Sequence, residues 1–337
     1  MGLQFGVGLP TCREGVAYPV GYVRPSDFTR IAQRAEQLGF DSLWANDHLT
    51  TPHILQETLD RPPGFYEPLI TFASVAAVTH TIRLVLSVIV LPEREPVLLA
   101  KQIATLDDLS DGRVTLGVGI GAYREEFEAV HPARAKANRG AMLDEGIAAL
   151  RCLFESKTAT HEGKYLQFRD VELAPKPRQQ PFPIYVNAHG DQGLDRVARA
   201  GNGWIASAPT PDALAAARAD LFQRVEAAGR DPGDISVNVQ IWVCTSPDDA
   251  RAESKLRRSQ HFRRLVARNP TRSEDSIVDE FRASNLLGSP DRLIERLQAY
   301  RAAGADHVGL VFLGETTDEL LEDMATFAES VLPIFAD

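Results

Sequence analysis

Short apolar runs alternate along this chain with longer segments rich in Ala, Leu and Arg. The apolar runs are nearly continuous and rich in β-branched residues, which is typical of parallel strands covered on both faces. They predict strands over residues 3–9, 42–45, 83–91, 114–118, 184–187, 204–206, 236–244 and 307–313. The longer segments predict helices over residues 25–38, 68–79, 96–109, 139–154, 192–200, 211–228, 290–303 and 317–332.

The junctions between these helices and strands repeat one arrangement. Gly39, Gly201 and Gly304 each close a helix just before a strand begins, and glycine readily adopts the left-handed conformation that ends a helix. Several helices begin with Pro in the first turn, where it is tolerated. Eight strand–helix units predict an α/β fold, a (β/α)8 TIM barrel in one domain over residues 1–337, because a doubly wound sheet would leave the last units unplaced.

Two segments do not fit simple strand–helix units. Residues 155–172 alternate around Glu162-Gly163-Lys164, which predicts a β-hairpin after the fourth helix. Residues 246–289 are polar and helix-prone, which predicts a helical insertion after the seventh strand. Its place on the functional face of a barrel makes it a candidate lid, and a packing or dimer-contact role is an equal alternative.

Composition describes an ordinary globular protein, with 44% hydrophobic and 24% charged residues. Lys and Arg number 36 against 46 Asp and Glu, a net charge of −10, so no general attraction for nucleic acid or for an anionic membrane is expected. The Arg-rich stretch 251–272 contains acids as well, which is typical of a solvated helix face.

Cysteine usage indicates the compartment. Cys12, Cys152 and Cys244 are odd in number and far apart, which argues against a disulfide framework or a zinc site and favours a reduced, cytoplasmic location. No metal cluster stands out. The first residues lack the pattern of a signal peptide, and no run of eighteen apolar residues occurs, so neither export nor a membrane span is expected.

Asp47-His48 is the most informative pair in the sequence. The pair follows the short strand 42–45, and the carboxyl ends of barrel strands carry the chemistry of this fold. Histidine has an unperturbed pKa of roughly 6.5, so it exchanges protons readily near neutral pH. The alternative is that His48 only caps the next helix or bonds a backbone carbonyl.

Three more strand ends carry candidate ligand-binding residues. Gly119, Ile120 and Gly121 belong to a glycine-rich run after strand four that lets a ligand approach bare backbone, with a tightly packed turn as the alternative. The spacing departs from the dinucleotide fingerprint, since its third Gly comes one residue early.

The segment Asn187-Ala188-His189-Gly190-Asp191 follows strand five and opens a helix. Such a helix start suits an anionic group, here a phosphate, with helix capping by Asp191 as the alternative. Ser87-Val88 lies at the end of strand three, and Arg94 is a candidate partner for a phosphate or a carboxylate.

A serine hydrolase built from Ser87, His48 and Asp47 is a rival interpretation. It is weak, because no G-x-S-x-G elbow occurs. From position at strand ends, the substrate pocket is expected to include residues of several loops: Cys12, Tyr66, Tyr123, Glu125, His189 and Trp242.

Together these residues resemble the bacterial luciferase-like oxidoreductases, which include flavin-dependent monooxygenases and coenzyme F420-dependent dehydrogenases. The resemblance covers nearly the whole chain and rests on the order and spacing of its landmarks. They are residues 39–44 with Asp47-His48, then 67–69, 96–102, 106–113, 116–121 with Glu126-Phe127, 175–177, 203–204 and 288–290.

The resemblance implies a TIM barrel with an insertion after strand seven. It implies that His48 is the base or acid beside the cofactor ring and that Asp47 contacts the cofactor. It further implies a non-proline cis peptide at Ser87-Val88, with the glycine run and residues 187–193 holding the phosphate end. The cofactor is expected to be reduced FMN or F420, with a small-molecule substrate, a separate flavin or F420 reductase, and a homodimer.

One departure from the family pattern guides the choice of reaction. The F420-dependent sugar dehydrogenases place an acidic proton donor directly after the paired glycines, where this chain has Ala122. The acid is then absent or supplied by Glu125 or Glu126. We therefore expect an FMNH2-dependent monooxygenase of a small organic substrate, with F420-dependent hydride transfer as the first alternative and a non-catalytic flavin-binding barrel as the second.

Overall fold

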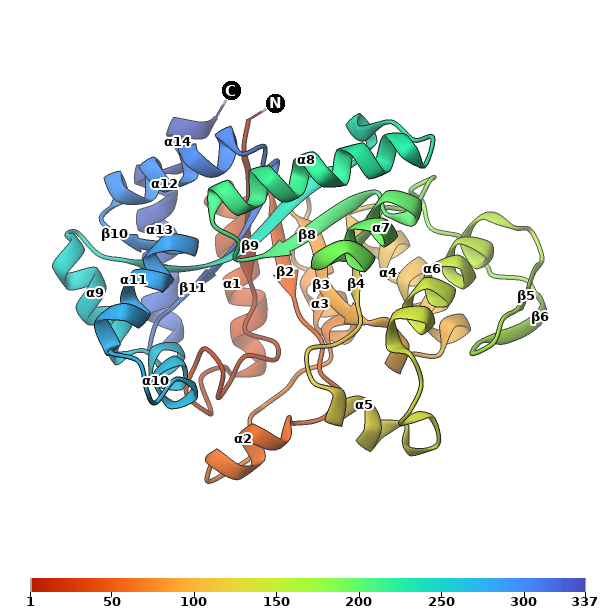
Figure 1. Ribbon diagram of the computed structural model, residues 1–337, viewed down its shortest axis with the longest axis horizontal. Coiled ribbons are helices and arrows are strands. Elements are labelled where there is room, and N and C mark those ends of the chain that lie inside the picture. Colours follow the sequence, from red (N-terminus) through yellow and green to blue (C-terminus); the bar gives the residue numbers. More distant parts are fainter. Residues whose placement is uncertain (1, 337) are drawn as a thin grey trace.

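Eight parallel strands close into a barrel in the computed structural model, which describes residues 2–336 (Figure 1). Pairing of β1 with β11 and of β8 with β9 completes the ring. The TIM barrel is therefore confirmed. The barrel strands are β1 (Gln4–Gly8), β2 (Ser42–Ala45), β3 (Arg83–Val90), β4 (Val114–Gly119), β7 (Ile184–Asn187), β8 (Gly203–Ser207), β9 (Ser236–Thr245) and β11 (His307–Phe312).

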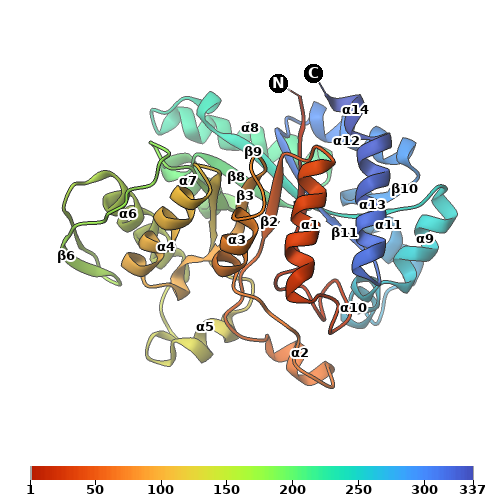
Figure 2. The ribbon, with the colours of Figure 1, turned by 180° about the vertical axis from the view of Figure 1, so that it is seen from behind.

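Helices surround this ring, and Figure 2 shows α1, α3 and α4 covering its far side. The main helices are α1 (Pro25–Gln37), α3 (Pro68–Ala76), α4 (Pro96–Leu109), α6 (Arg139–Glu155), α7 (Gly190–Ala200), α8 (Pro211–Ala227), α12 (Pro290–Ala302) and α13 (Thr317–Ser330). Among residues 2–336, no helix combines the length and the apolar character that crossing a bilayer requires.

The predicted last helix is in fact two helices. α13 ends at Ser330 and the short α14 (Leu332–Phe335) follows. Pro333 lies in the first turn of α14. Its ring occupies the place of an amide hydrogen and would clash with the carbonyl four residues earlier in a continuous helix. A helix break therefore falls just before this proline.

Two short helices that the pattern did not predict lie at the carboxyl ends of the strands. They are α2 (His53–Thr58), after β2, and α5 (Arg124–Val130), after β4. Both lie at the lower edge of Figure 1, while the two termini lie at the upper edge. The hairpin predicted around Glu162-Gly163-Lys164 is confirmed as β5 (Ala159–Glu162) and β6 (Gln167–Val171).

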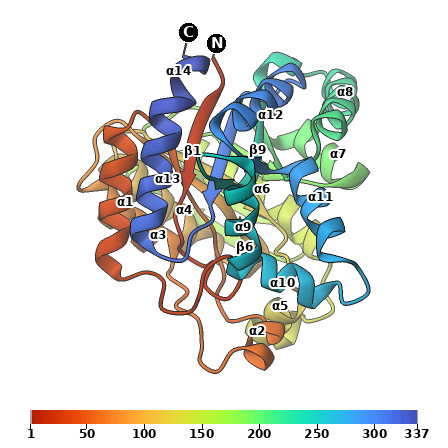
Figure 3. The same ribbon diagram turned by 90° about the vertical axis from the view of Figure 1, so that its left-hand side faces the viewer.

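The helical insertion after the seventh barrel strand is also confirmed. It contains α9 (Asp249–Arg258), α10 (Gln260–Arg268), α11 (Glu274–Ser284) and a short strand, β10 (Leu286–Gly288). β9 pairs with β8 over its first half, up to Gln240, and with β10 over its last three residues. The end of β9 thus pairs with the insertion and no longer with β8. Figure 3 shows α10 at the same end of the barrel as α2 and α5.

The interior of the barrel is filled around Trp44, whose side chain is 1% exposed. Its Nε1 donates a hydrogen bond of 2.8 Å to the Ser42 hydroxyl, which lies 2.8 Å from Nε2 of His307. Burial lowers the pKa of His307 to about 3, so its ring is neutral at physiological pH. Glycines at positions 6 and 309 make room, because a Cβ at either would collide with Trp44.

We expect Gly309→Ala to destabilise the protein by about 1–3 kcal/mol, the usual cost of overpacking a filled interior. The added Cβ would lie 2.6 Å from the Trp44 ring. Urea denaturation of both proteins measures the difference. Gly314→Ala is the matched control, because its new methyl group meets only the Glu319 side chain, at 3.2 Å or more; its effect should be smaller. Equal effects of the two substitutions would contradict this account of the interior.

Candidate active site

His48 forms a close pair with a buried carboxylate at the carboxyl end of the barrel. Its Nδ1 lies 3.0 Å from each carboxylate oxygen of Glu126. The side chain of Glu126 is 3% exposed and that of His48 is 15% exposed. Glu126 comes from the first turn of α5, and its carboxylate fixes the orientation of the His48 ring. Nε2 remains the nitrogen for a ligand.

Two aromatic rings flank this histidine. The ring centroid of His48 lies 5.3 Å from that of Phe65 and 6.0 Å from that of Tyr123. Both rings come from loops at the same end of the barrel, one before α3 and one just before α5. The imidazole therefore lies close to two aromatic rings, and part of it stays accessible.

Asp47 is engaged in a separate ion-pair network. Arg94 donates to Asp47 at 2.5 Å and to Glu67 at 3.1 Å, and the backbone amide of Val90 donates to Asp47 at 3.1 Å. Glu67 also caps α3. Arg94, predicted as a partner for a phosphate or a carboxylate, is thus paired with two carboxylates of the chain itself, and ligand binding by Arg94 stays a prediction. The network ties the loop after β2 to the end of β3; the predicted catalytic and cofactor role of Asp47 stays a prediction.

Glu93 is a further acid of this region that sequence reasoning did not single out. Its residue is 7% exposed, and among residues 2–336 its carboxyl group forms no hydrogen bond. Burial, together with the negative charges of Glu126 and Asp47, raises the pKa of Glu93 to about 7. A carboxyl group that exchanges its proton near neutral pH therefore lies in the electrostatic field of the His48–Glu126 pair. Its position directly after strand three was the only sequence signal.

The ends of β3 and β4 pack closely against each other. The peptide bond between Ser87 and Val88 is cis, as the resemblance implies, and Ser87 accepts a hydrogen bond of 3.4 Å from Gln240. A Cβ on Gly119 would lie 2.8 Å from the Val88 side chain, and one on Gly121 would lie 2.9 Å from Val90. The glycines are thus required for packing, and they leave the backbone next to them bare.

The start of α7 fits an anionic group. No side chain caps this helix in the structure, and Gly190 has a φ of +63°. The alternative that Asp191 caps the helix is wrong, because its carboxylate pairs with Arg224 at 2.8 Å. The side-chain amide of Asn187 donates to the carbonyl of Ile205 at 2.9 Å, and His189 is exposed. Uncapped amides and the helix dipole favour negative charge at this point.

The residues predicted for the substrate pocket have different environments. Cys12 is buried and its thiol donates to the Tyr66 carbonyl at 3.4 Å; burial raises the pKa of this thiol to about 12, so it is no nucleophile. Tyr66 packs edge-on against Phe28. Tyr123 accepts a hydrogen bond of 2.6 Å from Arg264 of the insertion. Trp242 and Glu125 are both partly exposed.

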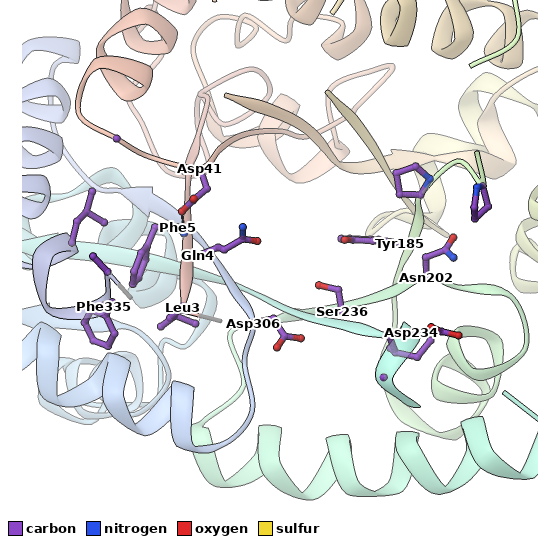
Figure 4. Close-up of a pocket in the computed structure, with 18 residues that line it drawn as sticks. Leu3, Gln4, Phe5, Asp41, Tyr185, Asn202, Asp234, Ser236, Asp306 and Phe335 are labelled. Atoms are coloured by element: carbon purple, nitrogen blue, oxygen red, sulfur yellow. Dashed lines mark hydrogen bonds between the residues drawn. The ribbon is translucent and has the colours of Figure 1, made fainter. Parts of the chain in front are cut away.

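A large cavity lies at the opposite end of the barrel (Figure 4). It measures about 760 Å³ and is lined by the amino-terminal ends of the strands, among them Gln4, Asp41, Ser236 and Asp306. Active sites of parallel barrels lie at the carboxyl ends, where the strand-to-helix loops meet. Volume therefore does not identify the candidate site, and the side-chain chemistry around His48 does.

Comparison with known proteins identifies the family of this chain. Residues 3–307 match the family described as luciferase-like monooxygenase. The F420-dependent glucose-6-phosphate dehydrogenase of Beutenbergia cavernae is 30% identical over 92% of this chain and 93% of its own length. The chain therefore belongs to the luciferase-like family and is an oxidoreductase.

Two solved structures show the same fold over the whole chain. An F420-dependent secondary alcohol dehydrogenase, in complex with an F420-acetone adduct, superposes with a TM-score of 0.79 at 21% identity and covers 100% of both chains. A monooxygenase from Streptomyces bottropensis superposes with a TM-score of 0.80 at 23% identity and covers 99% of this chain and 100% of its own. At these identities the likeness concerns the fold.

We expect the stability of Glu93→Gln, compared with that of the wild type, to increase as the pH rises. Native Glu93 keeps its proton up to about pH 7, whereas an unperturbed glutamate loses it near 4.5. The native state therefore holds the extra proton between these values, and the wild type loses stability as the pH rises through them. From pH 5 to pH 8 the variant should gain roughly 1–3 kcal/mol over the wild type.

Urea denaturation at both pH values measures this gain. The exposed Glu329→Gln is the control for the chemical change itself. If the stability difference between Glu93→Gln and the wild type is the same at pH 5 and pH 8, the raised pKa of Glu93 is wrong.

Proposed function

We propose that this protein binds the 5-deazaflavin coenzyme F420 at the carboxyl end of the barrel and catalyses hydride transfer between the coenzyme and a small organic substrate. The observation that carries the proposal is the hydrogen bond between His48 and the buried Glu126. The full-length relative from Beutenbergia cavernae, named as F420-dependent, supports the choice of cofactor.

This choice reverses the preference that the sequence suggested, and position 122 is the reason. Monooxygenation was favoured because Ala122 stands where an acidic proton donor is expected. In the structure Ala122 is exposed, while Glu126, four residues later, reaches the imidazole of His48. The His48–Glu126 pair can therefore take up or return a proton at the site, and Ala122 no longer argues against hydride transfer.

Each residue of the site would have a separate role in this reaction. Bound F420 supplies or accepts the hydride. Nε2 of His48 takes the proton of a substrate hydroxyl as the hydride leaves the adjacent carbon, or returns the proton in the reverse direction. Glu126 stabilises the imidazolium that forms. The uncapped amides of α7 would hold the phosphate, and the bare backbone around Gly119 and Gly121 would allow the ring to approach.

Reduced FMN is the second candidate cofactor, and the family description, luciferase-like monooxygenase, is the finding that favours it. In that case oxygen and a small organic molecule would be co-substrates, and a separate flavin reductase would supply FMNH2. A flavin-binding barrel without turnover is the third candidate, and the intact His48–Glu126 pair argues against it.

Assembly as a homodimer in the cytoplasm completes the proposal. Two apolar side chains on neighbouring helices support the dimer, Ile70 on α3 and Leu98 on α4, which are 68% and 58% exposed. Large exposed apolar side chains are common at interfaces between subunits. The three cysteines are unpaired, which fits a reducing compartment.

Anaerobic titration of the protein with reduced F420 and, separately, with FMNH2 tests the cofactor. We expect saturable absorbance changes with reduced F420 and none with FMNH2 at the same concentrations. Binding of FMNH2 alone would transfer the assignment to the second candidate, and the absence of binding by both would remove the proposed function.

We expect His48→Asn to lower kcat by about 10²–10⁴-fold, the usual contribution of a general acid or base. Glu126→Gln should lower it less and shift the pH profile, because the imidazolium loses its counter-charge. Both variants should bind reduced F420 as the wild type does. Turnover is measured with the alcohol that a screen with F420 identifies.

The matched control is His53→Asn, at the exposed start of α2 in the same loop region, which should retain full turnover. Unchanged turnover by His48→Asn would remove the catalytic role of His48. Cofactor binding by the wild type without turnover on any substrate would support the third candidate.

A further inference from the structure

Arg13 is a buried cation without a partner. Its residue is 7% exposed, and its Nε is buried without a hydrogen-bond partner. Among the described residues 2–336 it forms no ion pair. The neighbouring Glu14 does not supply one, and its carboxylate accepts from the backbone amides of Val23 and Gly64. Burial lowers the pKa of Arg13, but a guanidinium stays charged in proteins.

A second cation approaches the same place from the insertion. Arg264 of α10 donates to the Tyr123 hydroxyl at 2.6 Å, and its Nε is buried without a partner. Within residues 2–336 it also forms no ion pair with a carboxylate. Arg13 and Arg264 thus both lack a neutralising acid among the described residues.

Two aromatic residues join the arginines into one cluster. The Arg13 guanidinium lies 5.2 Å from the Trp242 ring, which lies 4.2 Å from the ring of the buried His261. Burial and the charges of Arg264 and Arg13 lower the pKa of His261 to about 3. The ring of His261 is therefore neutral, and both arginines lie close enough to influence its protonation. We call Arg13, Trp242, His261 and Arg264 the basic cluster.

The basic cluster lies beside the candidate active site. Arg264 contacts Tyr123, and the Tyr123 ring is 6.0 Å from that of His48. Arg13 follows β1, while the proposed phosphate site at the start of α7 follows β7. In the ring of strands β1 and β7 lie on opposite sides, so the two anion-binding regions are distinct.

We propose that Arg13 and Arg264 bind an oxyanion, a carboxylate or a phosphate, of the substrate, with the Trp242 face supporting the apolar part of the same molecule. A buried charge without a counter-charge is unfavourable, and a bound anion removes this penalty. Guanidinium groups match carboxylate and phosphate oxygens in pairs. Assigning the anion to the substrate rests on the proposed hydride transfer at His48, whereas anion binding itself does not.

Titration of the full chain, without cofactor and in buffer of low chloride, tests the cluster. The probes are benzoate, phenyl phosphate and the neutral benzamide, followed by tryptophan fluorescence because Trp242 lies in the cluster. We expect saturable binding of at least one anion and binding of benzamide at least ten-fold weaker. The stronger of benzoate and phenyl phosphate identifies the type of oxyanion.

Arg13→Met and Arg264→Met should each weaken the binding of the anion at least ten-fold. Arg263→Met is the matched control, because Arg263 is exposed on the same helix, and it should bind like the wild type. If Arg13→Met does not fold, Arg264→Met carries the test. Benzamide binding as tightly as both anions, or wild-type affinity in both test variants, would overturn the proposal.

Thermal unfolding distinguishes a ligand-binding role of Arg13 from a structural role. If Arg13 serves a ligand, Arg13→Met keeps or raises the Tm, because an unpaired buried charge is removed. The anion should raise the Tm of the wild type and not that of the variant. A lower Tm for Arg13→Met with an unchanged response to the anion would show a structural role. These measurements need neither cofactor nor turnover, so their failure and the failure of the proposed function are distinguishable.

Discussion

The whole arrangement depends on Trp44 filling the interior of a closed barrel. β1 and β11 can approach the indole only because residues 6 and 309 lack side chains. Closure brings β1, β2 and β11 together and aims their carboxyl ends at one region. His48 and Arg13 each follow one of these strands, so the packing around a single indole determines where the chemistry of the loops can meet.

Charge is distributed unevenly at this end of the barrel. Asp47 is matched by Arg94, and Glu126 is matched by His48. Glu93 and Arg13 have no such partner among residues 2–336. The Asp47–Arg94 pair holds two loops together, and the Glu126–His48 pair holds the residue that we propose as the catalytic base or acid. Arg13, a buried charge without a partner, is one of the residues that we propose to bind the substrate.

The insertion completes the site, although it is distant in sequence. β9 stops pairing with β8 after Gln240 and pairs with β10 over its last residues. The insertion meets the barrel at this end of β9. Arg264 can then reach Tyr123 from 141 residues away in the sequence. In this way the insertion places a cation beside the candidate active site, a contribution more specific than that of a general lid or a packing element.

The sequence by itself determined the barrel, its hairpin and its insertion, because buried parallel strands leave continuous apolar runs and helix ends leave Gly and Pro. It also placed His48 at the site and named Glu126 as one of two candidate acids. Only the tertiary structure decided that Glu126 holds His48, that Asp47 is paired with Arg94, and that Glu93 and Arg13 are buried without partners. The physical reason is that local pattern records burial and backbone conformation, whereas the partner and the pKa of a charged group depend on side chains that the fold brings together from distant loops.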